Sequence, residues 1–377
     1  MGAPIHLRGE LGLPLPGQWV ALLDGGPEAF PRMLEAIRAS QQSILLETYT
    51  FSREGVGEQF LAALSAAAQR GVRVRVVLDG WGSALDGRYV QALLRAAGCE
   101  VRIYHPVLSL LAGRFRRLHR KILLVDGEVA FVGGINISDE YGHLGPGHAP
   151  EVEEREPAWL DLVLEVRGPV AAWLERRLRG ERLRPPRGPV HVHLSGLGGG
   201  RPLRRRYLKA LGAARRKIGV AHAYFLPDRR LVRSLTAAAR RGVRVTLLLA
   251  GRSDVRLAQA ATRRLYHQLL KAGVRIHEWT RSVHHAKAAV VDDERLLAGS
   301  FNLEPYSLAN LEALVEVDDP AVAREGAAWI ERRVALAEEV TLAALARRSP
   351  LQRWLVDAAG LWVARLAQWV GRLLSRR

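Results

Sequence analysis

The chain carries the same order of segments twice, and this internal repeat constrains the fold more than any other feature. In the first half, an apolar strand-like run at 44–49 precedes a helix-like stretch at 58–70, a glycine and a β-branched run at 72–78. The equivalent segments of the second half are 218–221, 229–241 and 243–249. Two halves built to one plan predict two structurally equivalent lobes.

The repeat continues beyond these segments. Further helix-like stretches and short strands follow in both halves, at 89–97 and 101–103 and at 257–272 and 274–276. A last apolar run at 162–166 matches one at 313–317, and Pro169 and Pro320 each stand three residues beyond its final valine. Strands that alternate with helices predict an α/β protein of two pseudo-symmetric lobes, each a mixed β-sheet flanked by helices.

A length of 377 residues suits two domains, and 48% hydrophobic residues are enough for a core in each. We expect an N-terminal lobe at 1–179 and a C-terminal lobe at 207–340. Residues 180–206, rich in Pro, Gly and Arg, are interpreted as a linker with one strand candidate at 190–194. The predicted surface loop 142–157 and a tail at 341–377 complete the division.

The formal net charge is +18. Such an excess favours a polyanionic partner, either nucleic acid or an anionic membrane, but a biased coding composition also explains it. The single cysteine, Cys99, excludes a disulfide within the chain and fits a reducing compartment. Residues 1–10 contain no apolar signal-peptide core, and no uncharged apolar run reaches 18 residues, so we expect a soluble or peripheral protein.

One spaced motif occurs in both halves. The first copy has histidine, lysine and aspartate at His119, Lys121 and Asp126, and glycine and asparagine at Gly133 and Asn136. The second copy has the same five residue types at identical spacing: His285, Lys287, Asp292, Gly299 and Asn302. A single His-x-Lys pair is common on a surface strand, but the full set occurring twice in register with the repeat indicates a site.

The spacing has a physical meaning on a strand, where residues i and i+2 point to the same face. His119 and Lys121 therefore project together, as do His285 and Lys287. Lysine offers a positive charge to a phosphate oxygen, and histidine is a nucleophile or general acid near neutral pH. Two such sets brought together would surround one phosphoryl group. No His-Glu-x-x-His and no cysteine cluster occurs, so no metal site is predicted.

These motifs resemble those of the phospholipase D superfamily over residues 20–340. Four flanking segments are similar to bacterial cardiolipin synthases of the shorter branch without N-terminal membrane spans: 79–83, 223–228, 251–255, and 302–307 with Asn310 and Glu312. Two positions depart from the common pattern, because Gly134 replaces a serine and Glu304 replaces an aspartate.

The resemblance implies a phosphatidyltransferase that works through a phosphohistidine intermediate, without a metal or another cofactor, at an active site on the lobe interface. By analogy His119 is the nucleophile and His285 the acid and base, although pseudo-symmetry allows the reverse. Asp126 and Asp292 are expected to orient or stabilise the histidines. The candidate phosphate- or substrate-binding residues are Asn136, Asn302, Gly133, Ser300, Glu47, Tyr49, Tyr224 and Glu304.

Two segments favour a lipid substrate. Residues 106–117 mix apolar side chains with arginines and lead into the first motif, as a membrane-contacting loop does; a buried helical turn is the alternative. Residues 350–377 have the pattern of a basic amphipathic helix with tryptophans, which suits an anionic lipid interface. A helix docked on the second lobe explains that tail equally well.

A nuclease of the same superfamily would also use a basic surface, but the basic residues are not grouped with aromatic stacking platforms, and no nucleic-acid partner is expected. A scaffold with a decayed site is disfavoured by the intact motifs. We therefore expect a cardiolipin synthase-like enzyme, peripheral on the cytoplasmic side of a bacterial membrane. Hydrolysis of phospholipid to phosphatidic acid is the alternative. The sequence leaves open the phosphatidyl donor, the acceptor alcohol and the oligomeric state.

Overall fold

The computed structural model describes residues 12–110, 115–142, 157–196 and 199–347, together with Ala358 and Gly360. Most of the predicted loop at 142–157 and the predicted amphipathic tail at 350–377 lie outside the described residues. The chain divides into two compact units. The first unit comprises Met1–Leu194, Ala298–Ser300 and Leu311–Val317, and the second comprises Ser195–Leu297, Phe301–Asn310 and Asp318–Arg377.

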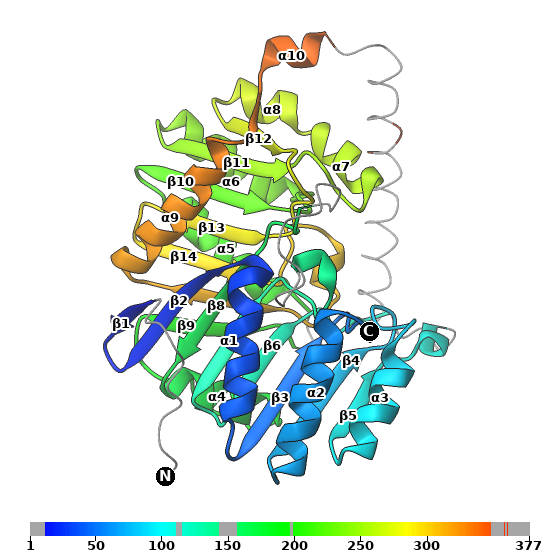
Figure 1. Ribbon diagram of the computed structural model, residues 1–377. Coiled ribbons are helices and arrows are strands. Elements are labelled where there is room, and N and C mark those ends of the chain that lie inside the picture. The colour runs from blue at the N-terminus through cyan, green and yellow to red at the C-terminus, as the bar shows by residue number, and fades with distance from the viewer. Residues whose placement is uncertain are drawn as a thin grey trace. The chain divides into compact units, whose positions relative to one another are not determined.

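The first eight-stranded sheet has the order β1-β2-β8-β7-β6-β3-β4-β5 (Figure 1). Its strands are β1 (Leu13–Leu15), β2 (Gln18–Asp24), β3 (Ser43–Thr48), β4 (Arg73–Asp79), β5 (Glu100–Tyr104), β6 (Lys121–Val125), β7 (Val129–Gly133) and β8 (Leu162–Arg167). β3, β4 and β5 are parallel to one another, whereas β6 is antiparallel to both β3 and β7. The sheet is therefore mixed.

The second eight-stranded sheet has the order β16-β12-β11-β10-β13-β14-β15-β9. Its strands are β9 (Val190–Leu194), β10 (Lys217–His222), β11 (Arg244–Ala250), β12 (Arg275–Trp279), β13 (Lys287–Val291), β14 (Arg295–Gly299), β15 (Ala313–Val317) and β16 (Glu338–Val340). β10, β11 and β12 are parallel, and β13 is antiparallel to β10.

Seven strands occupy matching places in the two sheets. Reading the second sheet from β9 to β12 reproduces the first sheet from β2 to β5, strand for strand. Among the strands that the structure describes, the edge strands β1 and β16 alone have no counterpart. The predicted α/β class with two repeated mixed sheets is confirmed.

Helices connect the strands in equivalent places. The helices of the first half are α1 (Gly25–Ala39), α2 (Val56–Gln69), α3 (Gly87–Ala96) and α4 (Pro169–Leu178). Those of the second half are α5 (Arg201–Ala213), α6 (Arg229–Arg240), α7 (Arg256–Arg263), α8 (Tyr266–Lys271), α9 (Pro320–Val334) and α10 (Leu342–Ala346). Gly71 and Gly242 follow α2 and α6 with φ of +88° and +90°, a conformation in which glycine lets the chain turn back into the next parallel strand.

The first core lies between the sheet and the helices α1 and α2, which run side by side in Figure 1. Phe30 of α1 meets Phe60 of α2 edge to face, with ring centroids 5.8 Å apart. All five residues of β6 and of β7 are buried. A strand covered on both faces reads as a continuous apolar run, and this is why the motif-bearing strands showed no alternation.

One helix differs from the sequence-based expectation. The helix predicted at 257–272 is two helices, because the chain turns at Arg264 and Leu265, whose N–H groups bond the carbonyls of Ala261 and Thr262. Residues 180–206 contain β9 at the predicted strand position 190–194, and α5 begins within them at Arg201. Within the described part of the chain, no helix is long and apolar enough to cross a bilayer.

Candidate active site

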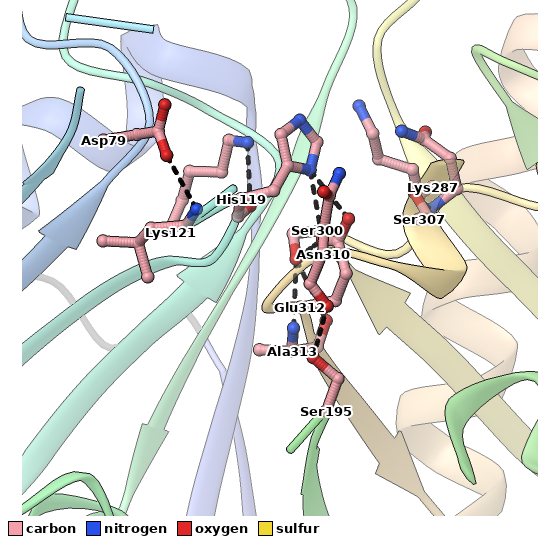
Figure 2. A network of polar contacts seen from close by, with 12 residues as sticks. Asp79, His119, Lys121, Ser195, Lys287, Ser300, Ser307, Asn310, Glu312 and Ala313 are labelled. Carbon is pink, nitrogen blue, oxygen red and sulfur yellow. Dashed lines mark hydrogen bonds and ion pairs between the residues drawn. The ribbon is translucent and has the colours of Figure 1, made fainter. Parts of the chain in front are cut away.

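In the first unit, His119 stands just before β6 and is held by the segment that precedes β15. Its backbone N–H donates to the carbonyl of Leu311 over 2.9 Å. Its imidazole Nδ1 lies 3.0 Å from Oε1 and 3.1 Å from Oε2 of Glu312 (Figure 2). The Glu312 side chain is fully buried, whereas that of His119 is 14% exposed. The carboxylate therefore holds the inner nitrogen of an imidazole that solvent still reaches.

Ser300 fixes the carboxylate of Glu312. The Ser300 hydroxyl donates to Oε2 of Glu312 over 2.5 Å and accepts the N–H of Ala313 at 3.0 Å. A carboxylate that accepts the Nδ1–H of the imidazole leaves the lone pair of Nε2 for chemistry. Sequence reasoning assigned Ser300 to the substrate and quoted Glu312 only within a resembling segment.

Lys121 and Tyr49 complete the surroundings of His119 in this unit. The Lys121 Nζ donates to the His119 carbonyl over 2.9 Å and lies 5.2 Å from the centroid of the Tyr49 ring. The same ring stands edge-on to the imidazole, with centroids 5.2 Å apart. Burial, and after it the charge of Asp79, raises the pKa of Tyr49 to about 12, so its hydroxyl remains protonated at neutral pH.

The second unit places its own histidine, lysine and tyrosine in the same relation. The Lys287 Nζ lies 2.8 Å from Nδ1 of His285 and also bonds the His285 carbonyl. The Tyr224 ring centroid is 6.0 Å from that of His285 and 5.8 Å from Lys287 Nζ. The Tyr224 hydroxyl donates to Asp254 over 2.6 Å. Asp254 was quoted in a resembling segment but not predicted as a site residue.

Asp126 does not orient His119, contrary to the sequence-based expectation. It lies at the far end of β6, seven residues on, which is roughly 20 Å of extended chain. Its φ is +55° and that of Gly127 is +65°, so the pair forms the tight turn into β7. The carboxylate accepts three backbone N–H groups at 2.8 Å each, from Gln41, Gln42 and Ser43. Its observed contacts anchor the β6–β7 hairpin to the start of β3.

Asp292 repeats this arrangement in the second unit, and the same correction applies. Its φ is +56°, and its carboxylate accepts the backbone N–H groups of Arg215, Arg216 and Lys217 at 2.7–2.9 Å. Burial raises the pKa of Asp292, but these hydrogen bonds outweigh it and the net pKa lies below the usual value. The aspartate of each motif thus joins the hairpin to the first strand of the repeat.

The two asparagines have different environments. The Asn136 side chain accepts the Thr50 N–H at 3.2 Å and donates to the Tyr141 hydroxyl over 3.0 Å, so these contacts tie loops together. Asn302 is 2% exposed, and its side-chain oxygen has no hydrogen-bond partner among the described residues. Asn302 therefore keeps an unused acceptor where Asn136 does not.

Gly133 and Gly299 serve close approach to the neighbouring strand. A Cβ on Gly133 would lie 2.7 Å from the Leu162 carbonyl, and one on Gly299 would lie 2.3 Å from the Ala313 carbonyl. Gly134 is similarly restricted, since a Cβ there would lie 2.4 Å from both carboxylate oxygens of the fully buried Asp161. The common serine does not fit at Gly134 without movement of Asp161.

Two predicted pocket residues make other contacts. The carboxylate of Glu47 forms an ion pair with Arg120 over 2.9 Å. Arg120 stands between His119 and Lys121, and in an extended chain its side chain points to the opposite face from theirs. Burial raises the pKa of Glu47, although Arg120 and then Arg75 oppose this. Glu304 is half-buried and lines a small hollow with Arg204 and Asp228.

Two buried residues beside the motifs were not predicted as site residues, although Asp79 belongs to the resembling segment 79–83. Asp79 ends β4, is fully buried, and binds the N–H of Leu118 at 2.8 Å, directly before His119. His222 ends β10 opposite Lys287 and is also fully buried, and neither ring nitrogen has a hydrogen-bond partner among the described residues. Burial, then Lys287 and His284, places the pKa of His222 well below its usual value. Neither residue belongs to the spaced motif, because each lies at the end of another strand.

Comparison with known proteins gives matches over both repeats. A family model described as the PLD-like domain of cardiolipin synthase matches residues 33–142 and 207–334. Cardiolipin synthase B of Escherichia coli (strain K12) is 37% identical over 329 residues, which covers 80% of this chain and 77% of that protein. A cardiolipin synthase of Geobacillus thermodenitrificans is 34% identical over 310 residues, covering 76% and 60%. The crystal structure of a phosphatidylserine synthase from Haemophilus influenzae Rd KW20 has the same fold, with a TM-score of 0.71, 14% identity and 96% of each chain covered.

Proposed function

The chain belongs to the cardiolipin synthase family of phospholipase D-like proteins, and we propose that it transfers a phosphatidyl group from one phosphatidylglycerol to a second, giving cardiolipin and glycerol. Family membership identifies a phosphatidyltransferase. The observation that carries the proposal is the pairing of His119 with Glu312 beside Lys121, since a histidine oriented in this way is suited to attack a phosphodiester.

We propose that both motifs act on one phosphorus. In the first half-reaction Nε2 of His119 bonds to phosphorus, the bond from phosphorus to the glycerol oxygen breaks, and His285 gives that oxygen a proton. In the second, the hydroxyl of another phosphatidylglycerol loses its proton to His285 as its oxygen bonds to phosphorus and the N–P bond breaks. Lys121 and Lys287 neutralise the phosphoryl oxygens throughout.

The direct test uses purified protein and phosphatidylglycerol vesicles. Cardiolipin and glycerol in equal amounts are the expected products, and His119→Ala should abolish both. His267→Ala is the matched control, because His267 is exposed on α8 and should leave turnover unchanged. Phosphatidic acid as the main product would instead identify a hydrolase, and cleavage of DNA with lipid inert would identify a nuclease.

A donor with a good leaving group separates the two histidines. A phosphatidyl p-nitrophenyl ester needs no acid for the first step. His285→Ala should therefore still release a burst of p-nitrophenol equal to the enzyme concentration, and an alkaline quench should trap phosphohistidine. His119→Ala should release none. A burst from His119→Ala and none from His285→Ala would reverse the assigned roles.

We also propose that the enzyme is peripheral on the cytoplasmic side of a bacterial membrane and that its partner there is anionic phospholipid. The net charge of +18 supports this. A fusion reporter and cell fractionation test it: the protein should sediment with membranes, leave them in high salt, and be protected from protease in intact spheroplasts.

A further inference from the structure

Large apolar side chains are exposed together in the first unit, on the loops that follow β4 and β5. The exposed fraction is 96% for Leu85, 72% for Leu108 and 51% for Trp81, and Val107 and Phe115 are also exposed. Single exposed apolar residues need no explanation, but a group of them on adjacent loops indicates an interaction surface.

Hydrogen bonds hold these loops side by side. β4 and β5 are parallel neighbours, and the Gly80 N–H donates to the Tyr104 carbonyl over 2.8 Å. The Arg117 guanidinium lies 5.5 Å from the centroid of the Trp81 ring and donates to the His105 carbonyl over 3.3 Å. These contacts hold the segments 81–85, 105–108 and 115–117 close to one another, and we name the three segments together the β4–β5 rim; β4 and β5 can be followed in Figure 1.

The rim is connected to His119 through Asp79. One carboxylate oxygen of Asp79 accepts the N–H groups of Trp81 and Gly82 at 2.9 and 3.0 Å, and the other accepts that of Leu118 at 2.8 Å. The Ser83 hydroxyl donates to the Tyr49 carbonyl over 2.9 Å. Because Leu118 precedes His119 and the Tyr49 ring stands against the imidazole, the rim is positioned together with the catalytic group.

The charge around the rim is favourable for an anionic surface. Arg116 and Arg117 belong to it, and the exposed Arg88 follows it on α3. Asp79 is fully buried and takes no part in the outer surface. A tryptophan and aliphatic side chains flanked by arginines match the composition that enters the boundary between lipid headgroups and acyl chains.

We propose that the β4–β5 rim enters the surface of an anionic phospholipid bilayer and presents headgroup phosphodiesters to His119. The proposal rests on the proposed function only for the identity of the reacting lipid. Since Leu85 and Leu108 are exposed, replacing them with aspartate leaves the core intact and places charge where the rim meets lipid.

The experiment compares Leu85→Asp/Leu108→Asp with Leu336→Asp/Leu342→Asp, a matched pair that is 52% and 42% exposed in the second unit. Binding is measured by sedimentation with phosphatidylglycerol–phosphatidylcholine vesicles. Turnover is measured on these vesicles and on dihexanoyl phosphatidylglycerol below its critical micelle concentration. The rim pair should bind vesicles and turn them over at least tenfold more weakly than wild type, yet use the monomeric lipid within twofold of wild type. The control pair should match wild type throughout.

Other results separate the possible failures. Vesicle binding and turnover at the wild-type level in the rim pair would overturn the proposal, as would an equal loss on the monomeric lipid. A change in mass by light scattering without lipid, with vesicle binding retained, would identify the rim as a protein–protein contact and also overturn it. Rim-dependent vesicle binding by a protein that turns over neither lipid would support the membrane surface and reject the proposed function. His119→Ala should bind vesicles like wild type.

Discussion

Nδ1 of His119 lies 3.0 Å from Oε1 of Glu312, although the two residues are 193 positions apart in the chain. Glu312 is fully buried and accepts a second hydrogen bond from Ser300. A buried carboxylate held in this way selects the imidazole tautomer and stabilises the charge that forms when Nε2 bonds to phosphorus.

Glu312→Gln should therefore lower kcat by about 100- to 10,000-fold while KM changes little, because the variant keeps the shape of the site but loses the anion that orients His119. Steady-state kinetics on phosphatidylglycerol vesicles measures the separation of kcat from KM. Glu316→Gln is the matched control: this buried carboxylate lies on β15, which begins directly after Glu312 in the chain, and pairs with His193. A kcat for Glu312→Gln within threefold of wild type would exclude the orienting role.

The aspartates of the two motifs should govern stability rather than chemistry. Asp126→Ala and Asp292→Ala each leave three backbone N–H groups without their acceptor, so the free energy of unfolding should fall by about 2–4 kcal/mol. Asparagine tolerates the left-handed turn and keeps one acceptor, so Asp126→Asn should lose less. Urea unfolding measures the loss. A variant that unfolds like wild type but is inactive would assign the aspartate to the reaction.

The repeat in the sequence predicted the repeated mixed sheets, because strand type and order follow from local composition and from short connections. It also placed His119 with Lys121 and His285 with Lys287, since residues two apart on a strand share a face. Both features depend on residues that are close together in the chain, so a single sequence is enough to predict them.

The partners of those residues were harder to predict. Glu312 contacts His119 because segments far apart in the chain lie side by side in the fold. Asp126 lies too far from the imidazole because the five residues of β6 separate them. The motif spacing alone looks like a catalytic triad and does not distinguish a hairpin anchor from an orienting acid. Asp79 and His222 were not predicted as site residues because they lie on strands outside the spaced motif.

His222 should make the protein less stable in acid. Its pKa in the folded state is well below 6.5 because burial, and then Lys287 and His284, disfavour its charged form. The folded state therefore gains nothing from protonation, while the unfolded state binds a proton as the pH falls below about 6.5, so stability is lost with decreasing pH. His222→Thr copies Thr48, the equivalent residue of β3, and should flatten this loss by up to about 1.4 kcal/mol per pH unit.

Urea unfolding at pH 7.5, 6.0 and 5.0 measures this difference. The groups near the His222 ring are Lys287 on β13, His284 before that strand and Tyr207 on α5, and all three stay unchanged in the variant. His267→Ala, at an exposed position on α8, should keep the wild-type slope. Equal slopes for His222→Thr and wild type would show that another group sets the acid limit.

The two copies of the motif differ in how they accommodate their acid, and this difference is testable. In the second copy the Ser300 hydroxyl donates to Glu312. In the first copy glycine (Gly134) stands at the position of Ser300, next to the shorter acid Asp161. Gly134→Ser puts a Cβ 2.4 Å from both Asp161 oxygens, and because Asp161 is fully buried it has little room to move. The free energy of unfolding should fall by about 1–3 kcal/mol. Gly196→Ser, where no atom of the described residues lies within 4 Å of the added Cβ, should change it by less than about 0.5 kcal/mol. Equal stability of the two variants would mean that the Gly134 position accepts the serine that its counterpart carries.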